Sequence, residues 1–451
     1  MEKGISLVGL GKLGAPMAVA LAARGMRVIG VDADIAKVEA LQQGRPPVFE
    51  PGLAEALSAA QGRLTATQSV EEAVQATDIT FIVVGTPADM DGSFSLRHVL
   101  PVCVAIGSAL ASKREFHVVV LTSTVMPGAT GGAVRQALEQ ASGKRAGVDF
   151  GLCYNPEFIA LGSVIRDFLN PDFLLIGESD ERAGAELESL YRSVCENRPA
   201  VARMNFVNAE IAKLSVNTYV TTKISFANML ARLCEKVPGA SVDVVTGAIG
   251  LDSRIGGKYL KGAISYGGPC FPRDNVAMIA FAGRVGAPAD MPRATNDFNR
   301  AQIHALAELV SQHLGAGEAA GVLGLTYKPN TDVTEEAAGL LLARELAARG
   351  LRVMAFDPEG RIPTLHKLGG SIHMATSAEE CIAQCGVVVL ATPWQAFLEI
   401  PADRWSRQNA PRVVIDCWRA LKQLESASGV LYMPLGNGIK REDSKANGAA
   451  Q

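Results

Sequence analysis

Short, uninterrupted apolar runs followed by turn residues dominate the N-terminal part of the chain. Residues 4–9 have the sequence GISLVG and residues 27–31 have RVIGV, with a stretch of small residues, 15–24, between them. Because these runs do not alternate with polar residues, they are typical of parallel strands buried on both faces, and the small residues favour a helix. The same pattern predicts further strands at 78–85, 116–122 and 150–154. A doubly wound α/β domain is therefore predicted.

A near-repeat predicts a second domain of the same kind. Residues 345–359, ELAARGLRVMAFDPE, resemble residues 20–34, ALAARGMRVIGVDAD, at a constant offset that aligns Asp357 with Asp32. Strands are predicted before and after the second copy, at 321–325, 387–392 and 413–416. The C-terminal third is therefore expected to be a second doubly wound α/β domain.

One long helical pattern without Gly or Pro, residues 205–237, lies between the two α/β patterns. A helix of that length spans roughly 45–50 Å, which is enough to link two domains. Lys213 and Asn217 lie four residues apart and share one face of this helix. On a largely apolar helix such a polar pair is either a satisfied buried pair or part of a site. The polar residues 436–451 contain no aromatic side chain and are expected to form a disordered tail.

Composition argues against several classes of protein. The 451 residues exceed what one hydrophobic core supports, and the formal net charge of -3 argues against a nucleic-acid binder. No apolar run is long enough to cross a bilayer, and the first residues lack the apolar core of a signal peptide. The 8 cysteines are scattered, which does not resemble a disulfide framework. A cytoplasmic protein with reduced thiols is therefore expected.

No metal site is expected. Cys381 and Cys385 share a helix face, but no further Cys or His completes the spacing of a zinc site. The 6 histidines show no ligand spacing, which disfavours a metalloenzyme.

Gly9, Gly11 and Gly14 form the pattern G-x-G-x-x-G between the first predicted strand and the following helix. The glycines allow a tight turn, a close approach of a pyrophosphate and close helix packing, while the helix N-terminus offers N–H groups. Asp32 ends the second strand, about 20 residues further on, and would accept hydrogen bonds from the adenosine ribose. Its carboxylate would repel a 2′-phosphate, which favours NAD over NADP. The alternative is a turn that binds no phosphate.

Polar side chains follow later strands in both predicted sheets. Thr86, Thr124 and Glu157 lie outside the carboxyl ends of strands, where open α/β sheets bind their ligands. The alternative for them is turn and cap chemistry. Lys328 follows a strand of the second domain and suits a phosphate or a hydroxyl, and a solvated loop lysine is its alternative. Because the second domain has GLTYKPN at 324–330 where the first has the glycine pattern, it is not expected to hold a second dinucleotide in the same way.

Cys270 has the setting of a nucleophile. It lies in the segment YGGPCFPRD, residues 266–274, directly before a predicted helix in which Pro272 suits the first turn. A thiol at a helix N-terminus feels the positive end of the macrodipole, which favours thiolate. The glycines let the backbone or a ligand approach closely. The alternative is a small buried thiol beside a tight turn, and the cysteine alone does not decide between them.

Together these residues resemble the UDP-glucose/GDP-mannose dehydrogenase family of nucleotide-sugar dehydrogenases over nearly the whole chain. The resemblance rests on motifs that follow one another in the family's order. They are GLGKLG with Asp32, Phe49-Glu-Pro-Gly-Leu53, Ser123-Thr-Val, Asn155-Pro-Glu-Phe158, Ala209-Glu-Ile-Ala-Lys213 with Asn217, Arg254-Ile-Gly256, the Cys270 segment, and Gly324-Leu-Thr-Tyr-Lys-Pro-Asn-Thr-Asp332.

The resemblance implies the domain organisation and the partners. It implies an α/β fold of two Rossmann-like doubly wound domains joined by a long central helix and a small helical dimerisation region. The implied divisions are an NAD-binding domain at 1–204, a central helical domain with the cysteine loop at 205–300, a UDP-sugar-binding domain at 301–435 and the tail at 436–451. The implied partners are NAD and a nucleotide sugar, in a homodimer or higher homo-oligomer, with no nucleic acid and no membrane.

The implied reaction oxidises the C6 alcohol of the sugar to a carboxylate with two NAD. Each NAD accepts two electrons, whereas the conversion of an alcohol to an acid releases four, so the intermediate aldehyde must be held while the cofactor exchanges. A cysteine thiolate can add to that aldehyde and give a thiohemiacetal, which again carries a hydride to donate. The second oxidation then gives a thioester that water hydrolyses.

The resemblance also implies residue roles. Cys270 would be the nucleophile, Asp274 and Lys213 would transfer protons, Lys213 and Asn217 would stabilise oxyanions, Glu157 would assist hydrolysis and Thr124 would position a water. The residues expected to bind NAD are Gly9, Gly11, Leu13, Gly14, Asp32, Lys37, Thr86, Thr124 and Arg273. The residues expected to bind the substrate are Glu157, Phe158, Lys213, Asn217, Arg254, Tyr259, Leu260, Lys261, Gly267 and Lys328.

The branch of the family is indicated by the loop before Cys270. Arg254-Ile-Gly256, followed by Tyr259-Leu-Lys261, resembles the UDP-glucose branch, in which the arginine reaches a neighbouring subunit's site. Four positions depart from the family's pattern: Leu161 replaces a frequent glutamate, Pro269 a frequent serine and Glu335 a frequent arginine, and the last arginine is displaced in Cys417-Trp418-Arg419. These departures leave GDP-mannose or a UDP-N-acetylhexosamine open as alternative substrates.

Two other classes of protein stay open on the sequence. A two-electron hydroxyacid or 6-phosphogluconate-type dehydrogenase shares the first domain, but it would need neither Cys270 nor a second α/β domain. A catalytically silent NAD-binding or regulatory protein would be expected to lose Cys270, Lys213 or Asp274, and all three are present.

Overall fold

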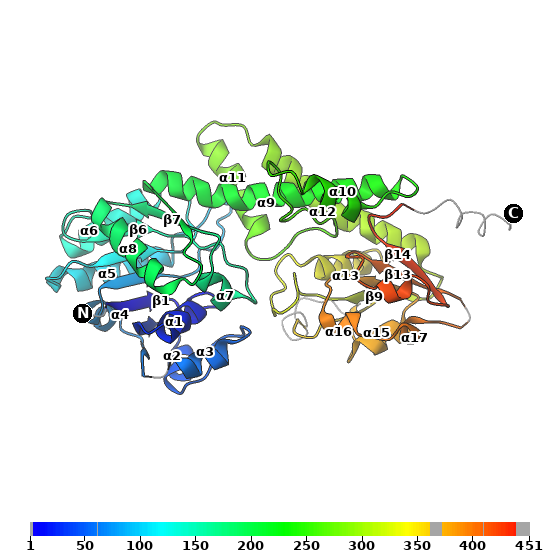
Figure 1. Ribbon diagram of the computed structural model, residues 1–451, viewed down its shortest axis with the longest axis horizontal. Coiled ribbons are helices and arrows are strands. Elements are labelled where there is room, and N and C mark those ends of the chain that lie inside the picture. Colours follow the sequence, from blue (N-terminus) through cyan, green and yellow to red (C-terminus); the bar gives the residue numbers. More distant parts are fainter. Residues whose placement is uncertain (1–2, 61, 361–371, 409, 439–451) are drawn as a thin grey trace. The chain divides into compact units, whose positions relative to one another are not determined.

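The computed structural model describes residues 3–60, 62–360, 372–408 and 410–438, and Figure 1 traces them from blue to red along the chain. The chain forms two compact units. The first unit consists of residues 1–215 with 280–286, and the second unit consists of residues 216–279 with 287–451.

The first unit is built on an eight-stranded sheet with the strand order β3-β2-β1-β4-β5-β6-β7-β8. All neighbouring strands are parallel except β6 and β7, which are antiparallel. The strands are β1 Gly4–Val8, β2 Arg27–Val31, β3 Leu64–Thr67, β4 Ile79–Ile82, β5 Val118–Leu121, β6 Gly151–Tyr154, β7 Phe173–Glu178 and β8 Ala200–Met204. The helices are α1 Gly14–Ala23, α2 Ile35–Gln42, α3 Leu53–Ala59, α4 Val70–Ala76, α5 Val99–Ser112, α6 Arg135–Ser142, α7 Val164–Leu169 and α8 Glu181–Val194, with a π-helical turn at Thr130–Val134.

The strands of this sheet are apolar without interruption because both faces are covered. Along β5, Val118 and Val120 belong to one hydrophobic cluster, which includes α1 and α8. Val119 and Leu121 belong to a second cluster, which includes α5 and α6. Alternate residues of one strand therefore enter two separate cores, which explains the absence of an alternating pattern. The predicted doubly wound sheet is confirmed.

The second unit has a six-stranded, all-parallel sheet with the order β11-β10-β9-β12-β13-β14. The strands are β9 Ala319–Leu323, β10 Arg352–Phe356, β11 Ile372–Met374, β12 Val387–Leu390, β13 Arg412–Asp416 and β14 Val430–Pro434. The helices on this sheet are α13 Ala338–Ala348, α15 Ala378–Gln384, α16 Gln395–Leu398 and α17 Ala402–Trp405, with a 3-10 turn at Lys422–Leu424. The predicted second α/β sheet is confirmed.

One 30-residue helix, α9 (Phe206–Glu235), begins in the first unit and ends in the second. At 1.5 Å per residue it is about 45 Å long, as the helical pattern predicted. It is the long green helix in Figure 1. The remaining helices are α10 Val242–Ile249, α11 Phe271–Arg284 and α12 Asp290–His313. The sequence prediction of two α/β sheets with a long central helix is thus confirmed.

Element boundaries differ from the predictions by a few residues. The strand predicted at 321–325 is β9, which begins and ends two residues earlier. The repeat is structural, because its offset carries β2 onto β10 and α1 onto α13. Most of the tail predicted at 436–451 lies outside the described residues, which end at 438.

Within the described ranges, no helix has the length and apolar character that a membrane span requires. In the same ranges, no three His, Cys, Asp or Glu side chains gather in a way that could hold a metal ion.

Candidate functional site

The glycine loop after β1 has the shape of a pyrophosphate cradle. Gly9 has a φ of +106°, and a Cβ there would lie 2.7 Å from the Val83 carbonyl oxygen. A Cβ on Gly14 would lie 1.9 Å from the Gly9 carbonyl oxygen, so both positions require glycine. A Cβ on Gly11 would meet no atom within 4 Å, which leaves open space above this residue.

The start of α1 is suited to an anion. Leu13 is its N-cap, with no side-chain cap hydrogen bond, and the first turn contains no acidic residue. The Ala15 N–H donates to the Gly11 carbonyl oxygen at 3.1 Å and Pro16 has no N–H, so the attraction of this helix end for a phosphate comes mainly from the positive end of its dipole. The loop and the helix together fit the diphosphate of a dinucleotide.

Asp32 stands at the carboxyl end of β2 with a side chain that is 12% exposed. Its carboxylate accepts hydrogen bonds from the Leu10 N–H at 2.7 Å and the Asp34 N–H at 2.9 Å. Lys37 donates to the same carboxylate at 3.2 Å. The acid is oriented by these donors and remains partly accessible, as contact with a ribose requires.

The loop after β5, which carries Thr124, is held from two sides. The Thr86 hydroxyl donates to the Thr124 carbonyl oxygen at 2.7 Å. The two carboxylate oxygens of Glu210, on α9, accept from the N–H groups of Gly128 at 2.6 Å and Thr130 at 2.8 Å. Glu210 is fully buried, and burial raises the pKa of its carboxyl group. Glu210, near the N-terminus of α9, thus fixes the loop that carries Thr124.

The loop after β6, which carries Glu157 and Phe158, is also held by α9. Lys213 donates to the Glu157 carbonyl oxygen at 2.6 Å, and its ammonium group lies 4.6 Å from the centroid of the Phe158 ring. The Glu157 carboxylate accepts from the Ile159 N–H at 2.6 Å. These contacts bring the predicted residues Glu157, Phe158 and Lys213 together.

Glu50 anchors the far end of the same loop. Its carboxylate is buried and accepts from the N–H groups of Gly162 at 2.8 Å and Val164 at 2.7 Å, at the start of α7. A carboxylate at a helix N-terminus is favoured by the dipole. The sequence motifs contained both Glu50 and Glu210, but their loop-holding contacts were missed, because these carboxylates bind backbone groups about 80 or more residues away in the chain.

Cys270 is solvent-exposed, whereas the other seven cysteines, all within the described residues, are buried. It directly precedes α11, and its carbonyl oxygen accepts from the Asp274 N–H at 2.8 Å, the first hydrogen bond of that helix. The alternative that Cys270 is a buried packing thiol is therefore wrong. The placement at a helix N-terminus is as predicted.

Asp274 and Asn217 form a buried pair in the second unit. The Asn217 amide donates to Asp274 Oδ2 at 2.6 Å, and the Asp274 side chain is 1% exposed. The Arg273 guanidinium lies 3.5 Å from the other carboxylate oxygen. Lys213 and Asn217 lie one turn apart on α9, and the boundary between the two units falls between them.

The remaining predicted substrate residues lie in the second unit with differing exposure. Arg254 has a side chain that is 87% exposed and pairs with Asp252 at 2.6 Å. Tyr259, with a φ of +63°, is exposed, Leu260 is buried and Lys261 is exposed. Lys328 is half-buried in the loop after β9. Gly267 needs to be glycine because a Cβ there would lie 2.1 Å from the Glu336 carbonyl oxygen.

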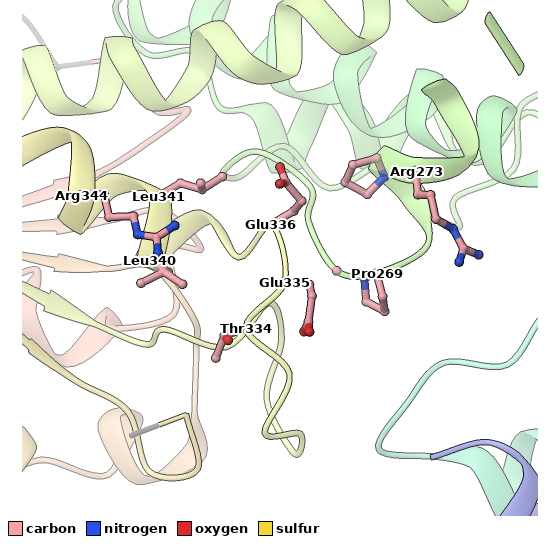
Figure 2. Close-up of a pocket in the computed structure, with 10 residues that line it drawn as sticks. Pro269, Arg273, Thr334, Glu335, Glu336, Leu340, Leu341 and Arg344 are labelled. Atoms are coloured by element: carbon pink, nitrogen blue, oxygen red, sulfur yellow. The ribbon is translucent and has the colours of Figure 1, made fainter. Parts of the chain in front are cut away.

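A cavity of about 480 Å³ lies beside the Cys270 segment within the second unit. Figure 2 shows Pro269 and Arg273 arriving from that segment, Thr334 to Glu336 from the loop before α13, and Leu340, Leu341 and Arg344 from α13 itself. The lining includes two guanidinium and two carboxylate groups. The pocket has a mixed polar and apolar lining and lies next to the segment that carries Cys270.

The fold and these residues define a dinucleotide-dependent oxidoreductase with a second nucleotide-sized α/β unit. Comparison with known proteins gives the family. The chain matches the UDP-glucose/GDP-mannose dehydrogenase family in its NAD binding domain over residues 3–195, its central domain over 207–301 and its UDP binding domain over 321–423. The chain belongs to this family, and it is an NAD-dependent nucleotide-sugar dehydrogenase.

Individual relatives carry different substrate names. The chain is 34% identical to the UDP-glucose 6-dehydrogenase of Haloferax volcanii, over 93% of this chain and 98% of that protein. It is 33% identical to the GDP-mannose 6-dehydrogenase of Azotobacter vinelandii, over 88% of this chain and 93% of that protein. Among solved structures, a UDP-glucose dehydrogenase from Pyrobaculum islandicum is 36% identical with a TM-score of 0.87, covering 97% of this chain and 98% of that one.

Proposed function

We propose that this protein oxidises the C6 alcohol of UDP-glucose to the carboxylate of UDP-glucuronate, with two NAD consumed per sugar. The observation that carries the proposal is Cys270, the one exposed cysteine among the eight, placed at the N-terminus of α11. A two-electron dehydrogenase does not need such a thiol. A four-electron oxidation needs a group that holds the aldehyde between the two oxidations.

Cys270 forms and later breaks the covalent bond to the sugar. Bound NAD supplies the acceptor for each hydride. The Cys270 thiolate adds to C6 of the aldehyde and the C6 oxygen takes up a proton from an acid, which gives a thiohemiacetal whose carbon again carries a hydride. Loss of that hydride, with the hydroxyl proton passing to a base, gives a thioester. Water then adds to the thioester, the carbon–sulfur bond breaks, and the carboxylate and the free thiolate result.

Asp274, Asn217 and Lys213 manage charge and protons around C6. The Asn217 amide holds the Asp274 carboxylate at 2.6 Å, one turn into the helix that Cys270 begins. This geometry suits Asp274 to proton transfer with the sugar hydroxyl or with water. Lys213 and Asn217 supply N–H donors that stabilise negative charge on the C6 oxygen.

Glu157 and Thr124 act in the hydrolysis. Glu157 assists the attack of water on the thioester, and Thr124 positions that water. In the first unit, Gly9, Gly11 and Gly14 hold the diphosphate of NAD and Asp32, paired with Lys37, holds its ribose. Thr86 and Arg273 are proposed as further residues that bind NAD.

UDP-glucose is favoured over other nucleotide sugars by the loop before Cys270. Its sequence Arg254-Ile-Gly256, with Tyr259 and Lys261 following, resembles the UDP-glucose branch, and relatives at 34% and 36% identity carry that name. Relatives named for GDP-mannose match about as well, at 33% to 35% identity, so GDP-mannose is the first alternative. A UDP-N-acetylhexosamine is the second alternative. The cytoplasm stays the predicted compartment.

A substrate panel with NADH counted per sugar tests the proposal. UDP-glucose, GDP-mannose and a UDP-N-acetylhexosamine are each supplied in limiting amount with excess NAD. We expect turnover with UDP-glucose and two NADH for each molecule consumed. Turnover only with another sugar would reassign the branch, and one NADH per sugar would contradict the four-electron reaction.

Cys270→Ser tests the covalent step. We expect net formation of the acid to fall by about a thousandfold or more, because a serine hydroxyl at neutral pH lacks the nucleophilicity of a thiolate. NAD binding, followed by calorimetry, should not change. Cys234→Ser, which alters a buried thiol of the same unit, is the control. Normal turnover in the Cys270 variant would refute the mechanism.

We further propose that two chains pair through α9. Tyr219, Phe226 and Leu233 recur every seven residues on this helix and are 61%, 46% and 55% exposed. An exposed apolar stripe of this kind is typical of a helix that packs against another chain. Light scattering should give a dimer or higher oligomer, and Phe226→Glu with Leu233→Glu should dissociate it. An unchanged mass would contradict the proposal.

The pairing has a functional test in Arg254. If this exposed arginine serves a neighbouring subunit's site, mixing an inactive Arg254→Ala protein with an inactive Cys270→Ser protein should restore part of the activity. No recovery in mixed oligomers would count against a shared site.

A further inference from the structure

Two asparagine side chains of the second unit hydrogen-bond to the backbone of the segment that precedes Cys270. The first is Asn228 on α9, which is 1% exposed. Its carbonyl oxygen accepts from the Ala263 N–H at 2.7 Å, and its amide nitrogen donates to the Ile264 carbonyl oxygen at 3.0 Å. Both halves of the side-chain amide are thus used on the backbone of the same segment.

The second is Asn299 on α12, which is 8% exposed. Its carbonyl oxygen accepts from the Tyr266 N–H at 2.9 Å, and its amide nitrogen donates to the Tyr266 carbonyl oxygen at 3.0 Å. A neighbouring β-strand would bind a residue in the same two-point manner. Asn299 therefore fixes both the position and the orientation of the backbone at Tyr266, four residues before Cys270.

The chain between Tyr266 and Cys270 is fixed on its other side by the backbone of the loop before α13. The Gly268 N–H donates to the Glu335 carbonyl oxygen at 3.0 Å. Gly268 has a φ of +86°, and the space beside Gly267 is filled by the Glu336 carbonyl oxygen. The backbone between Tyr266 and Cys270 is therefore held on two sides, by α12 and by this loop.

The Tyr266 side chain extends the same arrangement to α11. Its hydroxyl accepts from the Asn275 amide at 2.8 Å, and its ring lies edge-on to Phe271 with centroids 6.3 Å apart. Asn275 directly follows Asp274 in the helix that Cys270 begins. Tyr266, which Asn299 binds, therefore also contacts the first turns of α11, the helix that follows Cys270.

We propose that Asn299 is a positioning residue that holds Cys270 at the N-terminus of α11 in a reactive geometry. Asn228 supports it by binding the backbone earlier in the same segment. The proposal rests on the proposed role of Cys270 as the nucleophile. Displacement of a reacting group by about 1 Å can lower a rate a hundredfold. A segment with two adjacent glycines has little stiffness of its own, so side chains outside the segment must supply it.

Three variants of α12 test the proposal. Asn299→Leu keeps the approximate shape of the side chain and removes both hydrogen bonds. Asn299→Asp keeps the oxygen that accepts from Tyr266 and removes the donor. Thr295→Val, one turn earlier, is the matched control, because it alters a buried hydroxyl that contacts Thr222 at 3.3 Å and does not touch the segment.

The readout is the reaction of the thiol with a chromogenic aryl disulfide in the full-length protein without substrate. The Cys270 thiolate attacks the sulfur–sulfur bond, a mixed disulfide forms, and the coloured aryl thiolate leaves. Because the other seven cysteines are buried, the fast phase reports Cys270 alone. At neutral pH we expect Asn299→Leu to slow this phase about fivefold or more, since a displaced thiol loses the helix N-terminus.

Steady-state kinetics provide the second readout. We expect kcat of Asn299→Leu to fall by about tenfold to a hundredfold while the KM for NAD stays within about twofold. Asn299→Asp should lie between the leucine variant and the wild type, and it decides the question if the leucine variant does not fold. Thr295→Val should match the wild type in both readouts.

The proposal would be overturned if both Asn299 variants had the same labelling rate and the same kcat as Thr295→Val. Because labelling needs no substrate, the result is separate from the proposed function. A wild-type protein that oxidises no nucleotide sugar would refute the function while the labelling still tested Asn299. Normal labelling and normal turnover in the Asn299 variants of an active enzyme would refute the positioning role alone.

Discussion

The two sheets place an aspartate at the same point and use it in opposite ways. Asp32 ends β2 in the first unit, has a partly accessible carboxylate and receives three donors. Asp357 follows β10 in the second unit and is fully buried. Its carboxylate accepts from the N–H groups of Leu325, Thr326, Glu359 and Gly360, from the Thr326 hydroxyl and from the Trp394 indole.

The glycines of the two sheets show the same relation. Gly324 and Gly339 repeat the contacts of Gly9 and Gly14, since a Cβ on Gly339 would lie 1.9 Å from the Gly324 carbonyl oxygen. However, five residues separate β1 from α1, whereas 14 separate β9 from α13. The longer connection contains Lys328 and the loop that contacts the Cys270 segment.

A repeated framework does not imply a repeated ligand. In the first unit the acid is left accessible beside a short loop, which suits a dinucleotide. In the second unit the acid is consumed in holding a long loop, so it has no capacity left for a ribose. The expectation that the second unit does not bind a dinucleotide in the same way is consistent with this geometry.

The largest expected effect is a difference between the two aspartates in what their loss changes, either stability or NAD binding. Asp357→Ala leaves several buried donors without an acceptor and should lower the free energy of unfolding by about 3–5 kcal/mol. Its affinity for NAD should remain within about twofold of the wild type. Asp32→Ala should weaken NAD binding by about tenfold to a hundredfold with a smaller loss of stability. Urea unfolding and calorimetric titration of NAD measure the two quantities.

Equal weakening of NAD binding by Asp357→Ala and Asp32→Ala would contradict the different roles of the two aspartates. That result would place a second dinucleotide at the second sheet.

A smaller effect concerns acid sensitivity of the first unit. His117 is fully buried, its imidazole lies 2.8 Å from the Thr80 hydroxyl, and burial, reinforced by Lys113, lowers its pKa from 6.5 to about 3. Below pH 6.5 the unfolded chain takes up a proton that the folded unit does not. Stability is therefore highest above pH 6.5 and falls by about 1.4 kcal/mol per pH unit as the pH is lowered toward 3.

Urea midpoints measured between pH 7.5 and pH 5 test this effect. His117→Gln should flatten the dependence, whereas His304→Gln, which alters an exposed imidazole of the second unit, should keep the contribution of His117. An equal slope in the wild type and in the His117 variant would contradict the assignment.

The smallest effect concerns Lys37, which pairs with Asp32 at 3.2 Å while its side chain is 31% exposed. Lys37→Ala should weaken NAD binding by only about threefold, since a partly exposed ion pair contributes little. Titration of NAD at low and high salt checks both the size and the electrostatic origin. A loss as large as that of Asp32→Ala would mean that the lysine itself carries the binding.

The sequence predicted the parts of the molecule that depend on local pattern. The α/β class of both sheets, α9 and the place of Cys270 before α11 follow from apolar runs, helical periodicity and Pro272. The strands β3, β7, β8, β11 and β14 were not predicted. The contacts of Asn228, Asn299, Glu50 and Glu210 were not predicted, because each joins a side chain to backbone 33 or more residues away. Such contacts depend on how loops are packed, and the same residue types occur at many positions without them.

The central claim is that Cys270 carries the sugar between the two oxidations. The most direct measurement is mass spectrometry of peptides from the Glu157→Gln variant, quenched with acid during turnover of UDP-glucose with NAD. Because Glu157 is assigned to hydrolysis, the account predicts a thioester of the uronic acid that accumulates on Cys270 and on no other cysteine. Formation of two NADH per sugar with no adduct on Cys270 would contradict it.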